Sequence, residues 1–315
     1  MFRVAILDDY QEVAARHLGP LGDGVEVAVF QDHLAGEDDL VARLAAFDAV
    51  VAMRERTVFP ARVLERLPSL RLLVTTGMSN AAIDLEAAAR AGVVVCGTAG
   101  RGASTGELTI GLIVGLARRI PQEDAALRTG SWQTTLGIGL AGKTLGVVGL
   151  GRIGAQVATI GRVLGMDVVA WSENLTDARA SEVGVRRAAS LHELLEDSDV
   201  VTIHLRLSDR TRGLLGRGEL AAMKPTALLV NTSRGPIVDE DALVDALTAG
   251  GIAGAALDVF GEEPLPAGHP LLTAPNTLLT PHLGYVVDDN YAEYFEDAAE
   301  DVRAFLAGEP VRVIA

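Results

Sequence analysis

Three short motifs place an arginine, a glutamate and a histidine after apolar runs. They read VNTSRG at residues 230–235, LDVFGEEP at residues 257–264 and TPHLG at residues 280–284, and they contain Arg234, Glu263 and His282. A guanidinium binds carboxylates through a rigid fork of donors, an imidazole exchanges a proton near neutral pH, and a carboxylate favours the charged form of a nearby imidazole. Taken singly, each residue also suits a structural role: a solvated charge for Arg234, a turn for Glu263, a helix cap or core position for His282.

The apolar runs before these motifs belong to a longer series of predicted strands that alternate with helices. Strands are predicted at residues 3–7, 25–30, 49–53, 70–75 and 93–96, and again at 144–148, 167–171, 200–204, 227–231, 253–257 and 277–279. Helices are predicted near residues 12–18, 37–47, 60–67, 85–91, 104–119, 152–164 and 288–307. This order indicates parallel sheets covered by helices on both faces, whose strands converge on a ligand crevice at their carboxyl ends. Arg234, Glu263 and His282 can therefore meet there, although they lie 29 and 19 positions apart.

The same order predicts an α/β protein with two doubly wound parallel-sheet domains. A flavodoxin-like substrate domain is expected over residues 1–99 together with 284–315, because the last helix is expected to return to it. A Rossmann-type dinucleotide-binding domain is expected over residues 100–283, whose six predicted strands make a complete doubly wound unit.

The pattern GxGxxG occurs twice, at residues 137–142 and 149–154. The first follows no predicted strand, and we interpret it as a loop. The second lies between a predicted strand and a predicted helix, which is the context that a dinucleotide site requires. A turn that serves packing alone is the other interpretation.

Each glycine of the second pattern has a separate physical role. Gly149 permits a tight turn, Gly151 lets a pyrophosphate approach the backbone, and Gly154 lets the helix pack close to the strand. Arg152 and Ile153 open the helix, whose N-terminus offers N–H groups and a partial positive charge to a phosphate.

The next strand, at residues 167–171, is expected to end near the ribose of the adenosine. Ser172 occupies the position where an acidic residue is usual, and Glu173 follows it. Glu173 can accept hydrogen bonds from the ribose hydroxyls and would repel a 2′-phosphate. NAD is therefore favoured over NADP, with Arg179 near enough to keep NADP open.

Together, these motifs resemble the D-2-hydroxyacid dehydrogenase family over nearly the whole chain. The resemblance includes DLEAAA at 84–89, GKTLG at 142–146, the second glycine pattern, DVVTIH at 199–204, MKP at 223–225 and the three motifs named first. It implies an oxidoreductase that transfers a hydride between NAD(H) and C2 of a small 2-hydroxy acid or 2-keto acid.

The resemblance also implies roles for the residues. Arg234 would bind the substrate carboxylate and carbonyl and stabilise the charge that grows on the carbonyl oxygen. His282 would act as the general acid and base, and Glu263 would hold its imidazole. Asp258 resembles the family residue near the nicotinamide, and Thr232 is also expected to bind the cofactor. His204 ends a predicted strand at the crevice, so lining the cofactor site and structural packing are equally favoured.

The loop after residue 75 is expected, by the resemblance, to hold the substrate carboxylate. Gly77, Met78 and Ser79 are its candidate residues, and the backbone N–H groups of Met78 and Ser79 are the expected donors. The family often has a second glycine and an aromatic residue where this chain has Ser79 and Asn80. Arg54 is a further candidate for the pocket wall, with a surface ion pair to Glu55 or Glu37 as the alternative.

These departures leave the substrate open among lactate-, glycerate-, glyoxylate- and phosphoglycerate-type acids. Tyr285, which follows His282, departs from the usual small residue and is expected to reach the pocket. A formate- or phosphite-oxidising enzyme is a second enzymatic alternative, which Glu263 disfavours because formate enzymes resemble this pattern with Gln in its place. From another functional class, an NAD(H)-sensing, corepressor-like binding protein on the same fold is the rival.

Composition limits the partners. The net charge is −15, from 27 basic and 42 acidic residues, which argues against nucleic acid or an anionic membrane as a partner. The single cysteine, Cys96, excludes internal disulfides, and no cluster suggests a metal. No apolar run reaches the length of a membrane span and the N-terminus is unlike a signal peptide, so a cytoplasmic protein is expected. A homodimer is expected from the family, and residues 104–119 and 122–133 are the candidate interface. Trp132 is expected to anchor domain packing. No regulatory domain is expected after Ala315.

Overall fold

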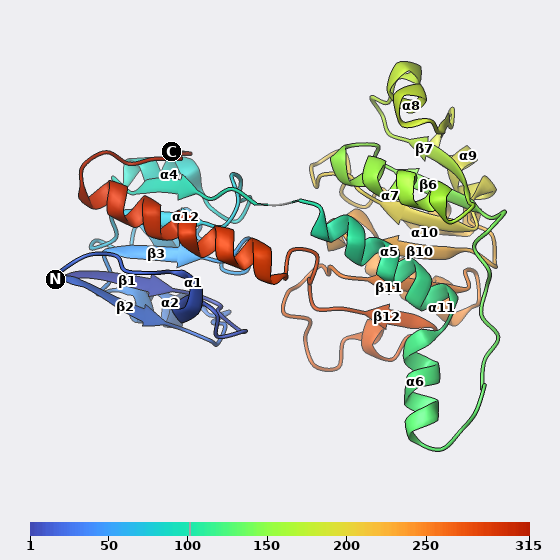
Figure 1. Ribbon diagram of the computed structural model, residues 1–315, viewed down its shortest axis with the longest axis horizontal. Coiled ribbons are helices and arrows are strands. Elements are labelled where there is room, and N and C mark those ends of the chain that lie inside the picture. Colours follow the sequence, from blue (N-terminus) through green and yellow to red (C-terminus); the bar gives the residue numbers. More distant parts are fainter. Residues whose placement is uncertain (101) are drawn as a thin grey trace. The chain divides into compact units, whose positions relative to one another are not determined.

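The computed structural model describes residues 1–100 and 102–315, and the chain forms two compact units (Figure 1). Unit 1 comprises Met1–Arg101 and Val287–Ala315, and unit 2 comprises Gly102–Val286. Each unit is built around its own parallel sheet with helices on both faces, so the predicted fold class is confirmed.

Unit 1 contains a five-stranded sheet in the order β2-β1-β3-β4-β5, the flavodoxin-like order. Its strands are β1 (Phe2–Ile6), β2 (Val25–Val29), β3 (Ala49–Ala52), β4 (Leu72–Thr75) and β5 (Val94–Gly97). Its helices are α1 (Ala14–His17), α2 (Glu37–Leu44), α3 (Ala61–Leu64), α4 (Leu85–Arg90) and α12 (Asp288–Leu306). Every residue of β3 and β4 is buried, because a parallel sheet covered on both faces requires continuous apolar strands.

The last helix, α12, belongs to unit 1 although it is far from the other elements along the chain (Figure 1). Its buried residues recur with the period of a helix: Asn290, Tyr291, Tyr294, Phe295, Ala298, Ala299, Asp301 and Val302. This stripe packs on the remainder of the unit, where α12 contacts α1 and β4.

Unit 2 contains a seven-stranded sheet in the order β12-β11-β10-β9-β6-β7-β8, a Rossmann-type arrangement. Its strands are β6 (Thr144–Val148), β7 (Asp167–Trp171), β8 (Arg186–Arg187), β9 (Val200–Ile203), β10 (Leu228–Asn231), β11 (Gly254–Leu257) and β12 (Thr277–Leu279). Its helices are α5 (Ser104–Ala117), α6 (Ile120–Arg128), α7 (Arg152–Val163), α8 (Asp177–Val183), α9 (Leu191–Asp197), α10 (Arg217–Ala222) and α11 (Glu240–Thr248), with short 3₁₀ turns at Gly235–Ile237 and Pro270–Leu272.

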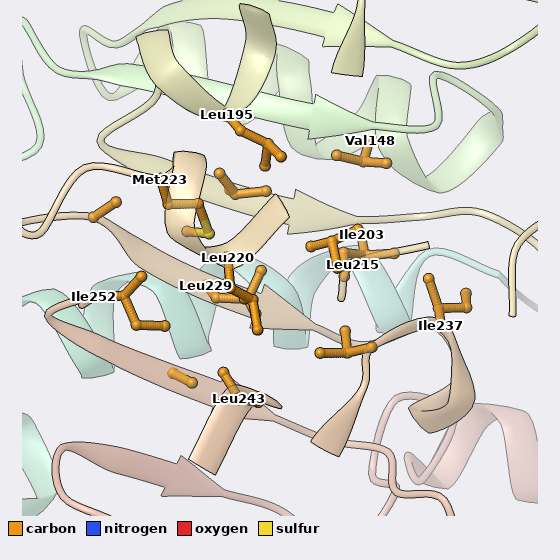
Figure 2. Close-up of a cluster of buried hydrophobic side chains, with 14 of the residues drawn as sticks. Val148, Leu195, Ile203, Leu215, Leu220, Met223, Leu229, Ile237, Leu243 and Ile252 are labelled. Carbon is orange, nitrogen blue, oxygen red and sulfur yellow. The ribbon is translucent and has the colours of Figure 1, made fainter. Parts of the chain in front are cut away.

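The core of unit 2 lies on both faces of its sheet. Figure 2 shows one face, where Val148, Ile203 and Leu229 of the strands meet Leu195, Leu220 and Leu243 of the helices. The neighbouring strand residues Val147, Leu228 and Val230 point to the opposite face and pack against α5 and α7. This alternation follows from the two-residue period of a strand and fixes the sheet between two helical layers.

Three local features differ from the sequence-based expectations. β8 consists of two exposed arginines, so the sequence contained no apolar run from which this strand could be predicted. The helix predicted to end at residue 119 stops at Ala117, because Arg119 takes a left-handed φ of 54°, and α6 then starts with Pro121 in its first turn. Trp132, expected to anchor domain packing, is instead 76% exposed.

Among the residues that the structure describes, no helix is long and apolar enough to cross a membrane.

Candidate active site

The predicted catalytic residues follow three neighbouring strands of unit 2. The strand ends Asn231, Leu257 and Leu279 stand side by side in register across β10, β11 and β12. Arg234 lies three residues beyond this row, and His282 lies three residues beyond it on another strand. The parallel sheet therefore delivers both segments, and the Glu263 segment between them, to one edge.

His282 and Glu263 form a direct pair. Nδ1 of His282 lies 2.6 Å from Oε2 of Glu263, and the two side chains are 19% and 31% exposed. The second carboxylate oxygen of Glu263 accepts a hydrogen bond from the backbone N–H of Phe260 at 2.9 Å. With a carboxylate facing Nδ1, the neutral ring carries its hydrogen there, so Nε2 is the nitrogen that can exchange a proton.

Asp258 holds the loop that carries His282. Its Oδ1 accepts hydrogen bonds from the Thr280 hydroxyl at 2.6 Å and from the Leu283 N–H at 2.7 Å, and its Oδ2 accepts one from the Gly284 N–H at 2.9 Å. These partners lie on both sides of His282, whose φ of 54° is left-handed. Burial raises the pKa of the Asp258 carboxyl, against the lowering effect of these hydrogen bonds. The carboxylate thus fixes the strained loop that carries His282.

The Arg234 segment packs onto the Glu263 segment through a glycine. A Cβ added at Gly235 would lie 2.0 Å from the backbone carbon of Phe260, so only glycine allows this approach. Arg234 itself donates from Nη1 to the Ser233 carbonyl at 2.7 Å, and its own carbonyl accepts from the Asn231 amide at 3.0 Å. The turn that presents Arg234 is therefore fixed at its backbone.

The glycine turn at residues 149–154 shows a separate constraint at each glycine. Gly149 has a φ of 102°, and a Cβ there would lie 2.8 Å from the backbone of His204. A Cβ at Gly154 would lie 2.0 Å from the Gly149 carbonyl oxygen. Among the residues that the structure describes, none has an atom within 4 Å of the Cβ position of Gly151, at the N-terminus of α7. Two glycines thus serve the turn, while the third leaves room for a phosphate.

The residues after β7 lie where an adenosine ribose is expected. Ser172 is half-buried and Glu173 is exposed. Arg179, noted as a reason to keep NADP open, reaches the glycine turn, where its Nε donates to the Leu150 carbonyl at 3.4 Å. The same guanidinium pairs with Glu182 at 2.8 Å.

Two predicted cofactor residues have hydrogen bonds inside the unit. The Thr232 hydroxyl lies 2.8 Å from the hydroxyl of buried Thr109 on α5. Nε2 of His204 lies 3.0 Å from the Thr202 hydroxyl, and burial lowers the pKa of His204 to about 3, so the ring is neutral. Thr109 was not singled out from the sequence, and its place inside an apolar helix was the signal that could have found it.

The predicted substrate-loop residues lie together in unit 1. The Arg54 guanidinium rests against Gly77, where an added Cβ would lie 2.0 Å from Nη1. The Gly77 N–H donates to the Thr98 hydroxyl at 2.9 Å, while Met78 and Ser79 are exposed. Arg54 also approaches Glu55 at 3.7 Å, so the ion pair considered as the alternative is present too.

Asn80, which the sequence marked only as a departure from the family, has a structural role. Its side-chain amide donates to the Arg54 carbonyl at 2.6 Å and to the Thr75 hydroxyl at 2.9 Å. Its side-chain oxygen accepts from the Ala82 N–H at 2.8 Å. Tyr285, expected to reach the pocket, is buried, and its ring meets the His282 ring edge-on at 5.4 Å between centroids.

Comparison with known proteins agrees with this arrangement. Residues 110–284 match the family described as D-isomer specific 2-hydroxyacid dehydrogenase, NAD binding domain. The chain is 42% identical to the glyoxylate reductase of Aeropyrum pernix over 257 residues, which cover 78% of this chain and 76% of that protein. The chain belongs to the D-isomer specific 2-hydroxyacid dehydrogenase family. The sequence-based assignment is therefore confirmed, and NAD(H) is the cofactor of the family domain found here.

Other family members differ in length and in name. The chain is 36% identical to the D-3-phosphoglycerate dehydrogenase of Methanocaldococcus jannaschii over 98% of its own length, but it spans only 58% of that protein. Among solved structures, the phosphoglycerate oxidoreductase of Vibrio cholerae is similar with a TM-score of 0.94 and 40% identity, over 98% of this chain and 100% of that chain. The D-lactate dehydrogenase of Escherichia coli is similar with a TM-score of 0.86 and 25% identity, over the full length of both chains.

Proposed function

We propose that this protein is an NAD-dependent dehydrogenase that transfers a hydride between NAD(H) and C2 of a small 2-hydroxy acid or 2-keto acid. The observation that carries the proposal is the His282–Glu263 pair at 2.6 Å, in a loop that Asp258 fixes on both sides of the histidine. A proton donor held this tightly at the carboxyl edge of a dinucleotide-binding sheet is what reduction of a carbonyl requires.

The proposed roles follow from the chemistry of each group. When bound, the nicotinamide supplies the hydride. His282 donates a proton from Nε2 to the carbonyl oxygen during reduction and takes it back during oxidation. Glu263 holds the ring through Nδ1, which lies 2.6 Å from its carboxylate, so that Nε2 faces the substrate. Asp258 acts on the position of His282 through the loop.

Arg234 is proposed to bind the substrate. Its guanidinium carries donors in a fixed fork that matches a carboxylate with an adjacent carbonyl. The charge also favours the oxyanion that develops as hydride arrives. In unit 1, Arg54 with the N–H groups of the exposed residues Met78 and Ser79 is proposed to contribute to carboxylate binding.

The glycine turn and its neighbours are proposed to hold NAD(H). Open space at Gly151 and the N-terminal N–H groups of α7 suit the pyrophosphate. Glu173 is proposed to accept hydrogen bonds from the ribose hydroxyls and to disfavour NADP. Arg179, which reaches the glycine turn, is the cation that would favour NADP instead. Thr232 and His204 are proposed to line the cofactor site, since the Thr232 hydroxyl and Nε2 of His204 already have partners in the unit.

The proposed function is tested with a panel of 2-keto acids and NADH, followed at the cofactor absorbance. We expect turnover with at least one of the small acids, and the ratio of catalytic efficiency with NADH and NADPH to favour NADH. Tight NADH binding without turnover of any acid would contradict the proposal and would favour the binding-protein alternative.

A single substitution tests the assigned proton donor. His282→Ala is expected to lower turnover by about 10²- to 10⁴-fold, the usual contribution of a positioned acid or base, and to leave the Kd for NADH nearly unchanged. His192→Ala is the matched control, because His192 is exposed on α9 and pairs with the exposed Glu196 at 3.3 Å. Unchanged turnover in His282→Ala would remove the histidine from the mechanism.

We also propose a homodimer formed through α6 and the segment after it. None of the nine residues of α6 is buried, and Ile120, Leu127 and Trp132 expose apolar side chains around one shallow groove. Glu123 fixes the returning segment, since its Oε1 accepts from the Thr135 N–H at 2.6 Å. A preformed arm with an apolar surface suits a second copy of the same chain.

A further inference from the structure

The carboxyl edge of the sheet in unit 1 holds a polar cluster between β1 and β3. The strand order reverses direction between these two strands, and in open parallel sheets this position is where ligands usually bind. Here the chain's own polar groups occupy it. Asp8 follows β1, and the segment from Arg54 to Thr57 follows β3.

Asp8 bonds to the segment after β3 with both its side chain and its backbone. It is 1% exposed, and its φ of 57° is left-handed. Its Oδ2 accepts from the Thr57 hydroxyl at 2.6 Å, and its carbonyl accepts from Arg56 Nη1 at 2.7 Å. Nδ1 of His33 lies 3.0 Å from Oδ1. A buried carboxylate with these partners fixes the far end of the segment.

Loop 75–80 fixes the near end of the same segment. The Arg54 N–H donates to the Thr76 hydroxyl at 2.8 Å, and the Asn80 amide donates to the Arg54 carbonyl at 2.6 Å. Arg54 has a φ of 51°, a conformation that a long side chain rarely adopts unless neighbouring bonds impose it. Its guanidinium donates to the Thr76 carbonyl at 3.2 Å and lies against Gly77.

We propose that Asp8 is a positioning residue for substrate binding: through Thr57 and Arg56 it holds the strained Arg54 against Gly77, in the orientation that receives the carboxylate of the keto acid. The inference rests on the proposed function, since Arg54 and the loop after Gly77 are the proposed carboxylate site in unit 1. It assigns Asp8 a part in substrate affinity, not in hydride transfer, because the proposed role acts through Thr57, Arg56 and Arg54 of unit 1.

The test removes one hydrogen bond from Asp8 without changing the shape of its partner. Thr57→Val is expected to raise the KM for the keto acid about tenfold, with kcat within about twofold and the Kd for NADH unchanged, which is the size of effect expected for one buried hydrogen bond to a charged group. Thr57→Ser, which restores the hydroxyl, is expected to return KM to within about twofold of wild type. Asp48→Asn is the control, because Asp48 makes a comparable bond to the Arg3 N–H at the opposite end of the sheet.

The amide NMR signal of Gly77 gives a second readout that needs no activity. It is expected to shift in Thr57→Val and to stay in place in Asp48→Asn, since Gly77 lies against the Arg54 guanidinium. A KM that is unchanged in Thr57→Val, or raised equally in Asp48→Asn, would overturn the proposal. If wild type turned over no keto acid, the proposed function would fail, and an unmoved Gly77 signal would then also overturn the link from Asp8 to Arg54.

Discussion

At the scale of single residues, the site of unit 2 is organised around two carboxylates with different tasks. Glu263 contacts the imidazole of His282 directly, whereas Asp258 contacts the backbone on either side of it. Asp258 is completely buried and Glu263 is partly exposed. Asp258 therefore sets where the loop that carries His282 stands, and Glu263 sets the direction in which the imidazole faces.

Turnover tests the second task. Glu263→Gln replaces the carboxylate that faces Nδ1 of His282 with a neutral amide, so the ring is held less firmly. Turnover of a keto acid is expected to fall about tenfold or more, while the Kd for NADH stays nearly unchanged. The neighbouring exposed Glu262→Gln is the matched control. Equal turnover in wild type and Glu263→Gln would show that Glu263 is not the partner.

Asp301 on α12 predicts a dependence on pH, of stability and not of activity. Burial raises the pKa of its carboxyl from 3.8 to about 7, although Arg312 lies 3.0 Å away and lowers it. A folded-state pKa above the unfolded value means that the folded chain binds the proton more tightly. The contribution of Asp301 to the free energy of unfolding is therefore largest below about pH 4 and falls as pH rises toward 7.

Urea unfolding at pH 5 and pH 8 measures this contribution. Asp301→Asn keeps an acceptor for Arg312 and is expected to reduce the loss of stability between the two pH values by about 2 to 3 kcal/mol, at about 1.4 kcal/mol per pH unit. Glu296→Gln, which removes an exposed carboxylate from the same helix, serves as the control. An equal loss in wild type and Asp301→Asn would refute the assignment.

At the scale of elements, the turn from β6 to α7 is the proposed pyrophosphate site, and it is also constrained by close packing. Gly154→Ala would place a Cβ 2.0 Å from the Gly149 carbonyl oxygen, so the turn must move. We expect a loss of about 1–3 kcal/mol in stability and at least a tenfold increase in the Kd for NADH. Fluorescence titration and thermal unfolding measure the two effects.

The other glycine pattern supplies the control for this prediction. A Cβ at Gly139 would meet no atom within 4 Å, so Gly139→Ala is expected to change stability by less than about 0.5 kcal/mol and to leave NADH binding intact. If both substitutions weakened NADH binding equally, the two patterns would not differ in the way that their neighbouring elements indicate.

At the scale of the whole molecule, the exposed surface of α6 predicts self-association. The double substitution Leu127→Glu and Trp132→Ser is expected to convert a dimer into a monomer, because it removes apolar groups that are 56% and 76% exposed in the single chain. Sedimentation measures the mass. Val163→Glu, at an exposed apolar position of α7, is expected to remain dimeric. A wild-type chain that sediments as a monomer would contradict the proposed interface.

The sequence by itself determined the family, the two-sheet α/β fold, and which glycine pattern follows a strand and opens a helix. These features are local or periodic: an apolar run of four to six residues, a helical stripe and a turn glycine carry their signal within a short window. The strand boundaries at residues 144–148, 167–171 and 277–279 coincide with the predicted ones for this reason. β8 lacked such a signal and was missed.

Only the tertiary structure decided how distant side chains support one another. Three hydrogen bonds join residues that are far apart in the chain. They are Asp258–Gly284, Thr109–Thr232 and Asp8–Thr57, with separations of 26, 123 and 49 positions. A hydrogen bond depends on distances within a few tenths of an ångström, which no spacing along the chain specifies. The sequence therefore predicted the residues that are proposed to do the chemistry, and the tertiary structure showed which residues hold them in place.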